Sequence, residues 1–249
     1  MMGWLERYLG VRPAPGATIA TVVATAILIG LGTWQIERLA WKNALISERT
    51  SNFAAAPVAL TGDDNAVEAL AWRRVSVTGR FLHDRELFLA ARSLRGNVGY
   101  HVLTPLQRDD GRVVLINRGW VGPPKKDPAA RAAANPPGPV RISGIVTLGA
   151  KKAWLGPDNN PSTNTWLWVD LPAMGQHLGT KLLPVVVEAD ATPNPGGFPI
   201  GGQTRINLPN DHLGYALTWY ALAVVLVVIW FAWHRRRARL ALRDAASND

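Results

Sequence analysis

The sequence contains no cysteine and only three methionines. Without cysteine the chain has no disulfide framework, no thiol redox centre and no covalent c-type haem attachment. A copper-transfer protein is also disfavoured, because such proteins hold copper with soft sulfur ligands. The chemistry of any site must therefore come from nitrogen and oxygen side chains.

The familiar catalytic and metal-binding patterns are missing as well. There is no Ser-His-Asp arrangement, no H-E-x-x-H zinc pattern and no EF-hand spacing. The Gly- and Pro-rich stretch 193–205 lacks the lysine and the strand-to-helix context of a phosphate loop. These absences favour a protein that is not an enzyme.

Charge is missing from two long windows, Pro13–Ile36 and Leu213–Trp233. Each is long enough, at the rise of a helix, to cross the hydrocarbon of a bilayer. The first is followed by T-W-Q-I-E-R instead of small cleavage-site residues, so we interpret it as an uncleaved anchor. We predict transmembrane helices over residues 16–36 and 212–233.

Arginines on the short flanks predict the orientation. Arg7 and Arg12 precede the first span, and an arginine cluster follows the second: Arg235, Arg236, Arg237, Arg239 and Arg243. The positive-inside rule then places residues 1–15 and 234–249 in the cytoplasm and residues 37–211 on the other side. Because the densest basic run is such a flank, the formal net charge of +9 is no sign of nucleic-acid binding.

Between the spans the sequence alternates in the manner of β-strands. A good hairpin turn lies at Arg108–Gly111, and 170–178 has the pattern of a short helix. The predicted strands are 72–81, 86–91, 99–107, 112–121, 140–148, 165–170 and 182–189. The predicted fold class is an α+β membrane protein, with two antiparallel transmembrane helices flanking a mainly antiparallel β extramembrane domain, a compact sheet or barrel.

The first helix is predicted to continue beyond the bilayer to about residue 53, because neither Gly nor Pro interrupts it. Gly16, Ala20 and Ala24 are small residues four apart, which predicts a face that a second helix can approach closely. If the two spans pack antiparallel, residues 34–42 and 212–219 lie at the same, non-cytoplasmic level. Two stretches far apart in the sequence thereby become neighbours.

His212 opens the second span and shares a helical face with Tyr215, Ala216 and Trp219 at i, i+3, i+4 and i+7. Imidazole can ligate haem iron, tryptophan can stack on a macrocycle, and an arginine such as Arg38 can hold a propionate. An alternative stays open. A histidine just outside a span is often a cap or an interfacial residue, and tryptophans at a boundary often form an interfacial belt.

Four blocks resemble the surfeit locus protein 1 family, in the family's order: Leu31–Lys42, Arg74–Phe81, Leu115–Val121 and Asn210–Tyr220. The resemblance implies an inner-membrane assembly factor for haem-copper cytochrome c oxidase that binds haem a as cargo. It further implies insertion of that haem into the largest oxidase subunit. The implied partners are that subunit, the haem a synthesis enzymes and the lipid bilayer, with no nucleic acid.

Carried over position by position, the family's histidine corresponds to His212, the expected ligand of the haem iron. The remaining residues of the expected haem-binding set are Trp34, Gln35, Arg38, Trp41, Lys42, Tyr215 and Trp219. The family's N-R-G-W-V block corresponds to Asn117–Val121, in which Gly119 also suits a bulge and Trp120 a core contact. Residues 123–161 contain no recognisable family motif.

The first span begins close to Met1, which leaves no space for a mitochondrial presequence. We therefore expect a multi-pass protein of a bacterial inner membrane. Two other functions stay open: a scaffold that holds an oxidase intermediate through its β domain without binding haem, suggested by eleven tryptophans, and a membrane oxidoreductase. The oxidoreductase is disfavoured because neither span offers a second inward-facing histidine.

Overall fold

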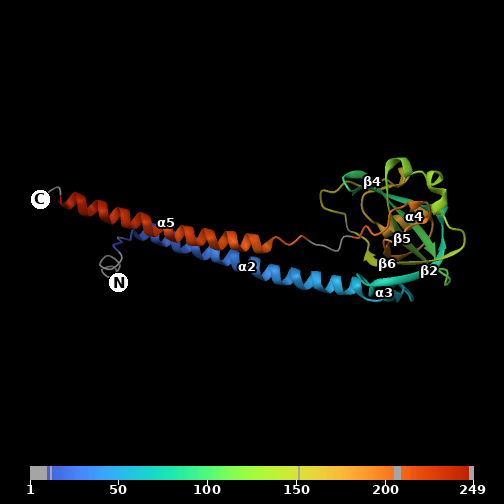
Figure 1. Cartoon of the computed structure of the whole chain (residues 1–249), viewed down its shortest axis with the longest axis horizontal. Helices are drawn as coiled ribbons and strands as arrows, with labels where there is room; N and C mark the ends of the chain where they lie inside the picture. The colour runs from blue at the N-terminus through green and yellow to red at the C-terminus, as the bar shows by residue number, and fades with distance from the viewer. Residues whose placement is uncertain (1–9, 12, 151, 205–208, 247–249) are drawn as a thin grey trace. The chain divides into compact units, whose positions relative to one another are not determined.

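The computed structural model describes residues 10–11, 13–150, 152–204 and 209–246 (Figure 1). The chain divides into two units. A helix unit consists of Met1–Ile46 with Asn207–Asp249, and a β unit consists of Ser47–Ile206. Arg7 and Arg12, on which part of the predicted orientation depends, lie outside the described residues.

The helix unit is a pair of long helices, α2 (Pro15–Ala54, whose last turns belong to the β unit) and α5 (His212–Ala246). Both are long and apolar enough to cross a membrane by length and composition. They run antiparallel, because Thr18 pairs with Trp230 at 3.2 Å and Thr33 with Tyr220 at 3.2 Å. The predicted arrangement of two apolar helices on either side of a β domain in the sequence is thus confirmed.

The face of α2 turned toward α5 follows an alternating three- and four-residue spacing, as in antiparallel coiled coils. Its less exposed residues include Thr18, Thr21, Thr25, Leu28, Gly32, Gln35, Leu39 and Lys42. Of the contact face predicted at Gly16, Ala20 and Ala24, the first two residues are exposed and a Cβ added at Gly16 would meet open space, whereas Ala24 is half-buried. The close approach occurs at Gly32, where a Cβ would lie 2.7 Å from Cε1 of the Tyr220 ring.

The β unit contains one eight-stranded sheet with two short helices. Its strands are β1 (Val58–Ala59), β2 (Arg74–Phe81), β3 (Leu87–Leu94), β4 (Asn97–Gln107), β5 (Val113–Val121), β6 (Pro139–Leu148), β7 (Thr165–Trp166) and β8 (Leu182–Ala189). The helices are α3 (Asp64–Glu68) and α4 (Leu171–Leu178). The 3₁₀ segments are η1 (His83–Arg85), η2 (Pro123–Lys125), η3 (Pro128–Ala134), η4 (Pro161–Thr163) and η5 (Pro195–Gly197).

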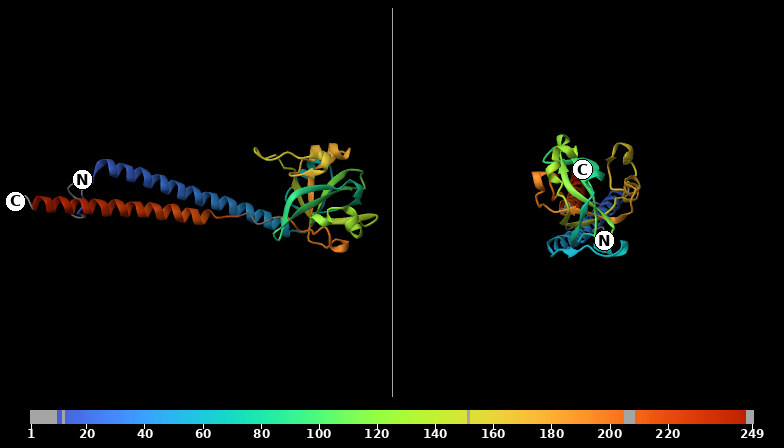
Figure 2. Two further views of the ribbon diagram at one scale, coloured as in Figure 1. Left: turned by 90° about the horizontal axis from the view of Figure 1, so that it is seen from above. Right: turned by 90° about the vertical axis from the view of Figure 1, so that its right-hand side faces the viewer.

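The sheet closes into a barrel, seen from two further sides in Figure 2. Its order is β1-β2-β6-β8-β5-β4-β3-β7, and an extra pairing of β2 with β4 completes the ring β2-β6-β8-β5-β4. Most pairs are antiparallel, and the parallel ones are β1–β2, β3–β7 and β5–β8. The prediction of a mainly antiparallel β domain is confirmed.

One strand is shorter than predicted. Of 165–170 only Thr165 and Trp166 pair in the sheet, because Asn159 Oδ1 accepts the next two backbone N–H groups, at 2.8 and 3.3 Å. Asp170 then caps the predicted helix, accepting from the N–H of Ala173. The hairpin turn expected at Arg108–Gly111 is present, with Gly111 at φ +82°.

β5 is the central strand of the core, buried at every position. Val114 and Ile116 point into the barrel, whereas Val113 and Leu115 pack on the opposite side against the cluster that contains α4. A continuous apolar strand of this kind is typical of a strand covered on both faces. The residues that follow on the same strand, Asn117 and Arg118, are therefore carried into the interior, where each needs a polar partner.

Candidate functional site

The first residue of α5 meets α2 through a polar pair. His212 Nδ1 lies 2.6 Å from Gln35 Oε1, and both residues are half-buried. Asn43 and Asn210 form the next polar contact of the same pair, at 2.7 Å. The antiparallel packing thus brings together two residues that lie 177 positions apart.

This contact fixes the tautomer of the histidine. An amide oxygen accepts only, so Nδ1 of His212 carries the proton and Nε2 keeps its lone pair. Among the described residues the ring has no hydrogen-bond partner other than Gln35. Metal-binding histidines are usually held in this manner, with the second ring nitrogen donating to an oxygen that sets the orientation of the ring.

The aromatic residues of the expected set are on the outside of the helix pair. Trp34, Trp41 and Tyr215 are each more than half exposed. The guanidinium of Arg38 lies 4.0 Å from the ring of Trp41, on its own helix. Within the described residues no hydrogen bond or ring contact links Trp34, Arg38 or Trp41 to α5. Of the expected haem-binding residues on α2, Gln35 is the one that contacts His212.

The face expected to unite His212, Tyr215, Ala216 and Trp219 is divided by the seam between the helices. Ala216 is fully buried against α2, Trp219 is half-buried and Tyr215 is exposed. The reason is the helical period, because a residue three positions on is displaced by about 60° around the axis. Tyr215 therefore lies beside the seam, where a ligand on the outer surface of the pair can reach it.

These residues suit a porphyrin ligated through iron. The chain offers one imidazole nitrogen with a lone pair, exposed aromatic faces on both helices, and two cations, Arg38 and Lys42, for carboxylates. The other histidine of α5, His234, lies about 33 Å farther along the helix at 1.5 Å per residue. His212 is therefore the histidine that α5 offers at this level.

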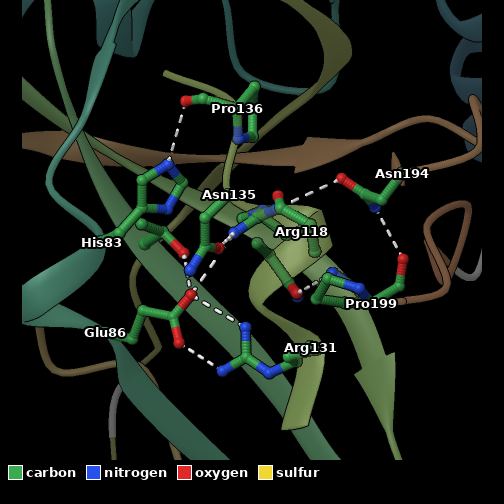
Figure 3. A network of polar contacts seen from close by, with 12 residues as sticks. His83, Glu86, Arg118, Arg131, Asn135, Pro136, Asn194 and Pro199 are labelled. Atoms are coloured by element: carbon green, nitrogen blue, oxygen red, sulfur yellow. Dashed lines mark hydrogen bonds and ion pairs between the residues drawn. The ribbon is translucent and has the colours of Figure 1, made fainter. Parts of the chain in front are cut away.

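The N-R-G-W-V block contributes a buried ion network in the β unit (Figure 3). Arg118 Nη1 lies 3.3 Å from Glu86 Oε1, and Arg131, from η3, pairs with both oxygens of the same carboxylate. Their side chains are at most 2% exposed. Burial lowers the pKa of Arg118 to about 10, with the charge of Arg131 acting in the same direction and Glu86 opposing it.

The network connects loops to the barrel. Arg118 also donates to the Ala134 carbonyl, to Asn135 Oδ1 at 3.4 Å and to Asn194 Oδ1 at 3.5 Å (Figure 3). It thereby fastens the segment after β5 and the segment after β8. Arg131 lies in the region without a family motif, and neither it nor Glu86 stands out in the sequence, because their contact joins positions 45 apart with no local pattern.

Gly119 and Trp120 have structural roles, as their alternative interpretation predicts. The register of β4 and β5 shifts between Val102 and Leu103, which is a bulge, and Gly119 there has φ +119°. A Cβ on Gly119 would lie 2.0 Å from the Ile200 carbonyl oxygen, so only glycine fits. Trp120 is 9% exposed and donates from Nε1 to the carbonyl of Arg92 at 3.0 Å.

Comparison with known proteins decides the family. The model of the SURF1 family matches residues 22–224, which is most of the chain. The chain belongs to the SURF1 family. It is 37% identical to the SURF1-like protein of Monosiga brevicollis over 230 residues, 87% of each chain. It is also 37% identical to the Surfeit locus protein 1 of Rattus norvegicus over 227 residues, 85% of this chain and 74% of that protein.

The human Surfeit locus protein 1 is similar to the same extent, 37% identical over 218 residues, 81% of this chain and 72% of that protein. The range matched by the SURF1 family contains Gln35, His212, and the Glu86, Arg118 and Arg131 network. It ends within α5 and leaves the arginine cluster after the second span outside. The resemblance to the surfeit locus protein 1 family is thus confirmed over both units of the chain.

Proposed function

We propose that this SURF1 family member is a non-enzymatic assembly factor of haem-copper cytochrome c oxidase that holds haem a as cargo. In this proposal His212 ligates the iron, and the haem lies against the outer surface of the α2–α5 pair. The chain would pass the haem to the largest oxidase subunit, after receiving it from the enzymes that make it. Its location would be a bacterial inner membrane.

The contact between Gln35 and His212 is the observation that carries this proposal. It leaves Nε2 with a lone pair, the state that an axial ligand requires. Haem chemistry at the iron would come from the bound group itself. The chain's own residues would orient the imidazole, offer aromatic surface beside it through Trp34 and Tyr215, and provide cations for the propionates through Arg38 and Lys42.

The proposed orientation follows from charge. The arginines of α5 beyond Trp233 are exposed at its C-terminal end. By the positive-inside rule this end is cytoplasmic, so both chain ends are cytoplasmic and the β unit is periplasmic. His212 then lies at the periplasmic surface, the level at which a lipid-soluble haem would place its propionates. Reporter fusions after residues 60 and 249 test this arrangement, and an equal reporter signal at both points would contradict it.

Absorption spectroscopy tests the haem proposal. Wild type, His212→Ala and His234→Ala should be expressed with the haem a synthesis enzymes in a bacterial host and purified in detergent. We expect haem a in wild type and in His234→Ala, and at least a tenfold loss in His212→Ala. His234 is the matched control because it belongs to the same helix and its Nδ1 binds the Trp230 carbonyl at 2.7 Å.

Two results would reject this proposal in different ways. If wild-type protein purified from haem a-producing cells contains no haem, the cargo role is lost. If His212→Ala keeps its haem and His234→Ala loses it, a haem is bound but at the other end of the helix pair.

A scaffold function is favoured by one observation in the β unit. Trp154 and Leu155 are 93% and 85% exposed, side by side between β6 and β7. Exposed tryptophan beside an apolar neighbour is typical of protein interfaces. In this second proposal the β unit holds an oxidase intermediate and no haem is needed.

Crosslinking separates the two functions. A scaffold should capture the largest oxidase subunit equally well in His212→Ala and in cells without haem a, and should lose it in Trp154→Ala/Leu155→Ala. Capture of the subunit that is lost in His212→Ala and retained in Trp154→Ala/Leu155→Ala would reject the scaffold function.

A further inference from the structure

The β unit contains a polar cavity that shares no residue with the helix site. Its volume is about 560 Å³, within the range of small-molecule sites. Polar side chains converge on it from five strands and one loop: Arg92 on β3, His101 on β4, Asn117 on β5, Thr147 on β6, Glu188 on β8 and Gln203 after β8. Leu89, Val169 and Trp72 contribute apolar surface to the same cavity.

Asn117 organises the polar wall. Its Nδ2 donates to Glu188 Oε2 at 2.7 Å and approaches His101 Nδ1 at 3.0 Å, while its Oδ1 accepts from the backbone N–H of Gly119 at 3.1 Å. The amide cannot be turned round, since the backbone N–H of Gly119 needs an acceptor. His101 Nδ1 is therefore an acceptor, and the ring carries its proton on Nε2.

The backbone around the cavity is held in an unfavourable conformation. Trp72 and Ala91, both in the lining, have φ +63° and +56°. They are two of the four non-glycine residues with positive φ in the described chain. Ala91 belongs to a bulge, where the register of β3 and β4 shifts between Leu89 and Arg92. Strain that persists in this way is found preferentially at binding sites, and the bulge redirects the side chain that follows it.

The lining contains a cation and a carboxyl, Arg92 and Glu188. Arg92 is the lining residue that stays charged at every physiological pH, and it donates from Nη2 to the neutral carbonyl of Leu167 at 3.2 Å. Burial raises the pKa of Glu188 to about 7, against the hydrogen bonds from Asn117 and Thr147 and the charge of Arg92. The carboxyl is therefore neutral in about half of the molecules near pH 7.

We infer that this cavity is a second binding site, for a small ligand that combines a carboxylate with an apolar group. The guanidinium of Arg92 suits a carboxylate through paired N–H donors, and the Gln203 amide, which donates one N–H to the Gly201 carbonyl at 2.9 Å, has a second N–H to offer. Leu89, Val169 and Trp72 cover the apolar part. A cationic ligand would meet the charge of Arg92, which disfavours its binding.

Binding of the anion is coupled to a proton. A carboxylate beside Glu188 favours the protonated form of that side chain, so affinity falls as the pH rises through about 7. Arg92 and His101 face Glu188 from one side, and the Arg74–Asp190 pair, at 3.4 Å, lies on the other side, in a neighbouring cavity of about 400 Å³ that also includes Glu188. The two cavities share Glu188 and Thr204.

The experiment uses purified full-length protein in detergent and three probes of one shape: benzoate, benzamide and benzylamine. Saturation-transfer NMR and titration calorimetry at pH 6 and pH 8 measure their binding. We expect benzoate to bind at least tenfold more tightly than benzamide, severalfold more tightly at pH 6 than at pH 8, and benzylamine not to bind. Glu188→Gln should bind benzoate with no pH dependence.

Variants locate the binding. Arg92→Gln should weaken the affinity for benzoate at least tenfold. The matched control is Arg141→Gln, at an exposed arginine on β6 outside the cavity, and it should leave this affinity unchanged. Ser93 is an exposed residue of the lining, so Ser93→Trp puts a large side chain beside the cavity and should abolish binding even if Arg92→Gln fails to fold. Absence of benzoate binding at millimolar concentration, equal binding by Ser93→Trp, or preference for benzylamine overturns the inference. None of these results bears on haem at His212.

Discussion

The two units treat polar side chains in opposite ways. In the helix unit a few polar groups are placed along an apolar seam, and His212, the one with chemical potential, is half-buried with a single partner and one unused nitrogen. In the β unit the polar groups of the core are fully enclosed, and Arg118 alone has contacts to four other residues. A side chain kept for a ligand needs an unused atom, whereas a buried side chain that holds loops together directs its charged end at several partners.

Removing the shared carboxylate of the ion network should give the largest effect. Glu86→Gln leaves two buried guanidiniums without a counter-ion, which should destabilise the β unit by about 3–5 kcal/mol. Tryptophan fluorescence during urea unfolding measures this loss. The control Asp84→Asn removes an exposed carboxylate two positions away and should cost less than about 0.5 kcal/mol. If both variants unfold alike, the β unit does not depend on its buried network.

In the helix unit, the corresponding test is whether Gln35 orients His212 for haem binding. Gln35→Leu removes the acceptor that fixes the tautomer of His212, so haem a retention should fall about 10- to 100-fold, with an altered absorption spectrum of what remains. Asn43→Leu is the matched control, because it removes the neighbouring polar contact of the same helices and leaves His212 untouched. Equal haem loss in both variants would mean that Gln35 only holds the helices together.

Gly32 tests how tightly the seam is packed. Gly32→Leu would drive a side chain into the ring of Tyr220 and should weaken the helix pair by about 2 kcal/mol. Gly30→Leu, at an exposed site with open space around it, should leave the pair intact. The chain has no cysteine, so cysteines introduced at Thr18 and Trp230 can report the packing by bifunctional crosslinking. Undiminished crosslinking in Gly32→Leu would show that the contact between the two helices tolerates a larger side chain at this position.

Glu188 should give the smallest effect, visible as a pH dependence of stability. Burial raises its pKa from 4.5 to about 7, so between these values the folded chain holds a proton that the unfolded chain has released. The stability of the β unit should therefore fall as the pH rises from 4.5 to 7, by about 1 kcal/mol after allowance for partial exposure. Glu188→Gln should remove this slope in unfolding measurements at pH 5 and pH 8, with Glu68→Gln as the control.

Local pattern was sufficient for most of the elements. The strands from β2 to β6 and β8 are found where alternation predicts them, and both apolar windows form helices, because period and absence of charge are properties of neighbouring residues. The strand predicted at 165–170 ends at Trp166 for a non-local reason, since Asn159 accepts from the next two backbone N–H groups, which a longer strand would use. Connectivity also predicts that residues 34–42 and 212–219 lie at one level.

The sequence by itself determined two apolar helices around a β domain, and it singled out His212 and Gln35 through the resemblance to the SURF1 family. Only the tertiary structure decided that these two side chains touch, that Gly32 and not Gly16 makes the close approach, and that Glu86 pairs with Arg131. The cavity around Glu188 was equally invisible in the sequence. Each of these depends on which residues face one another across distant segments, and that register is set by the packing of whole elements and by barrel closure, which no local pattern encodes.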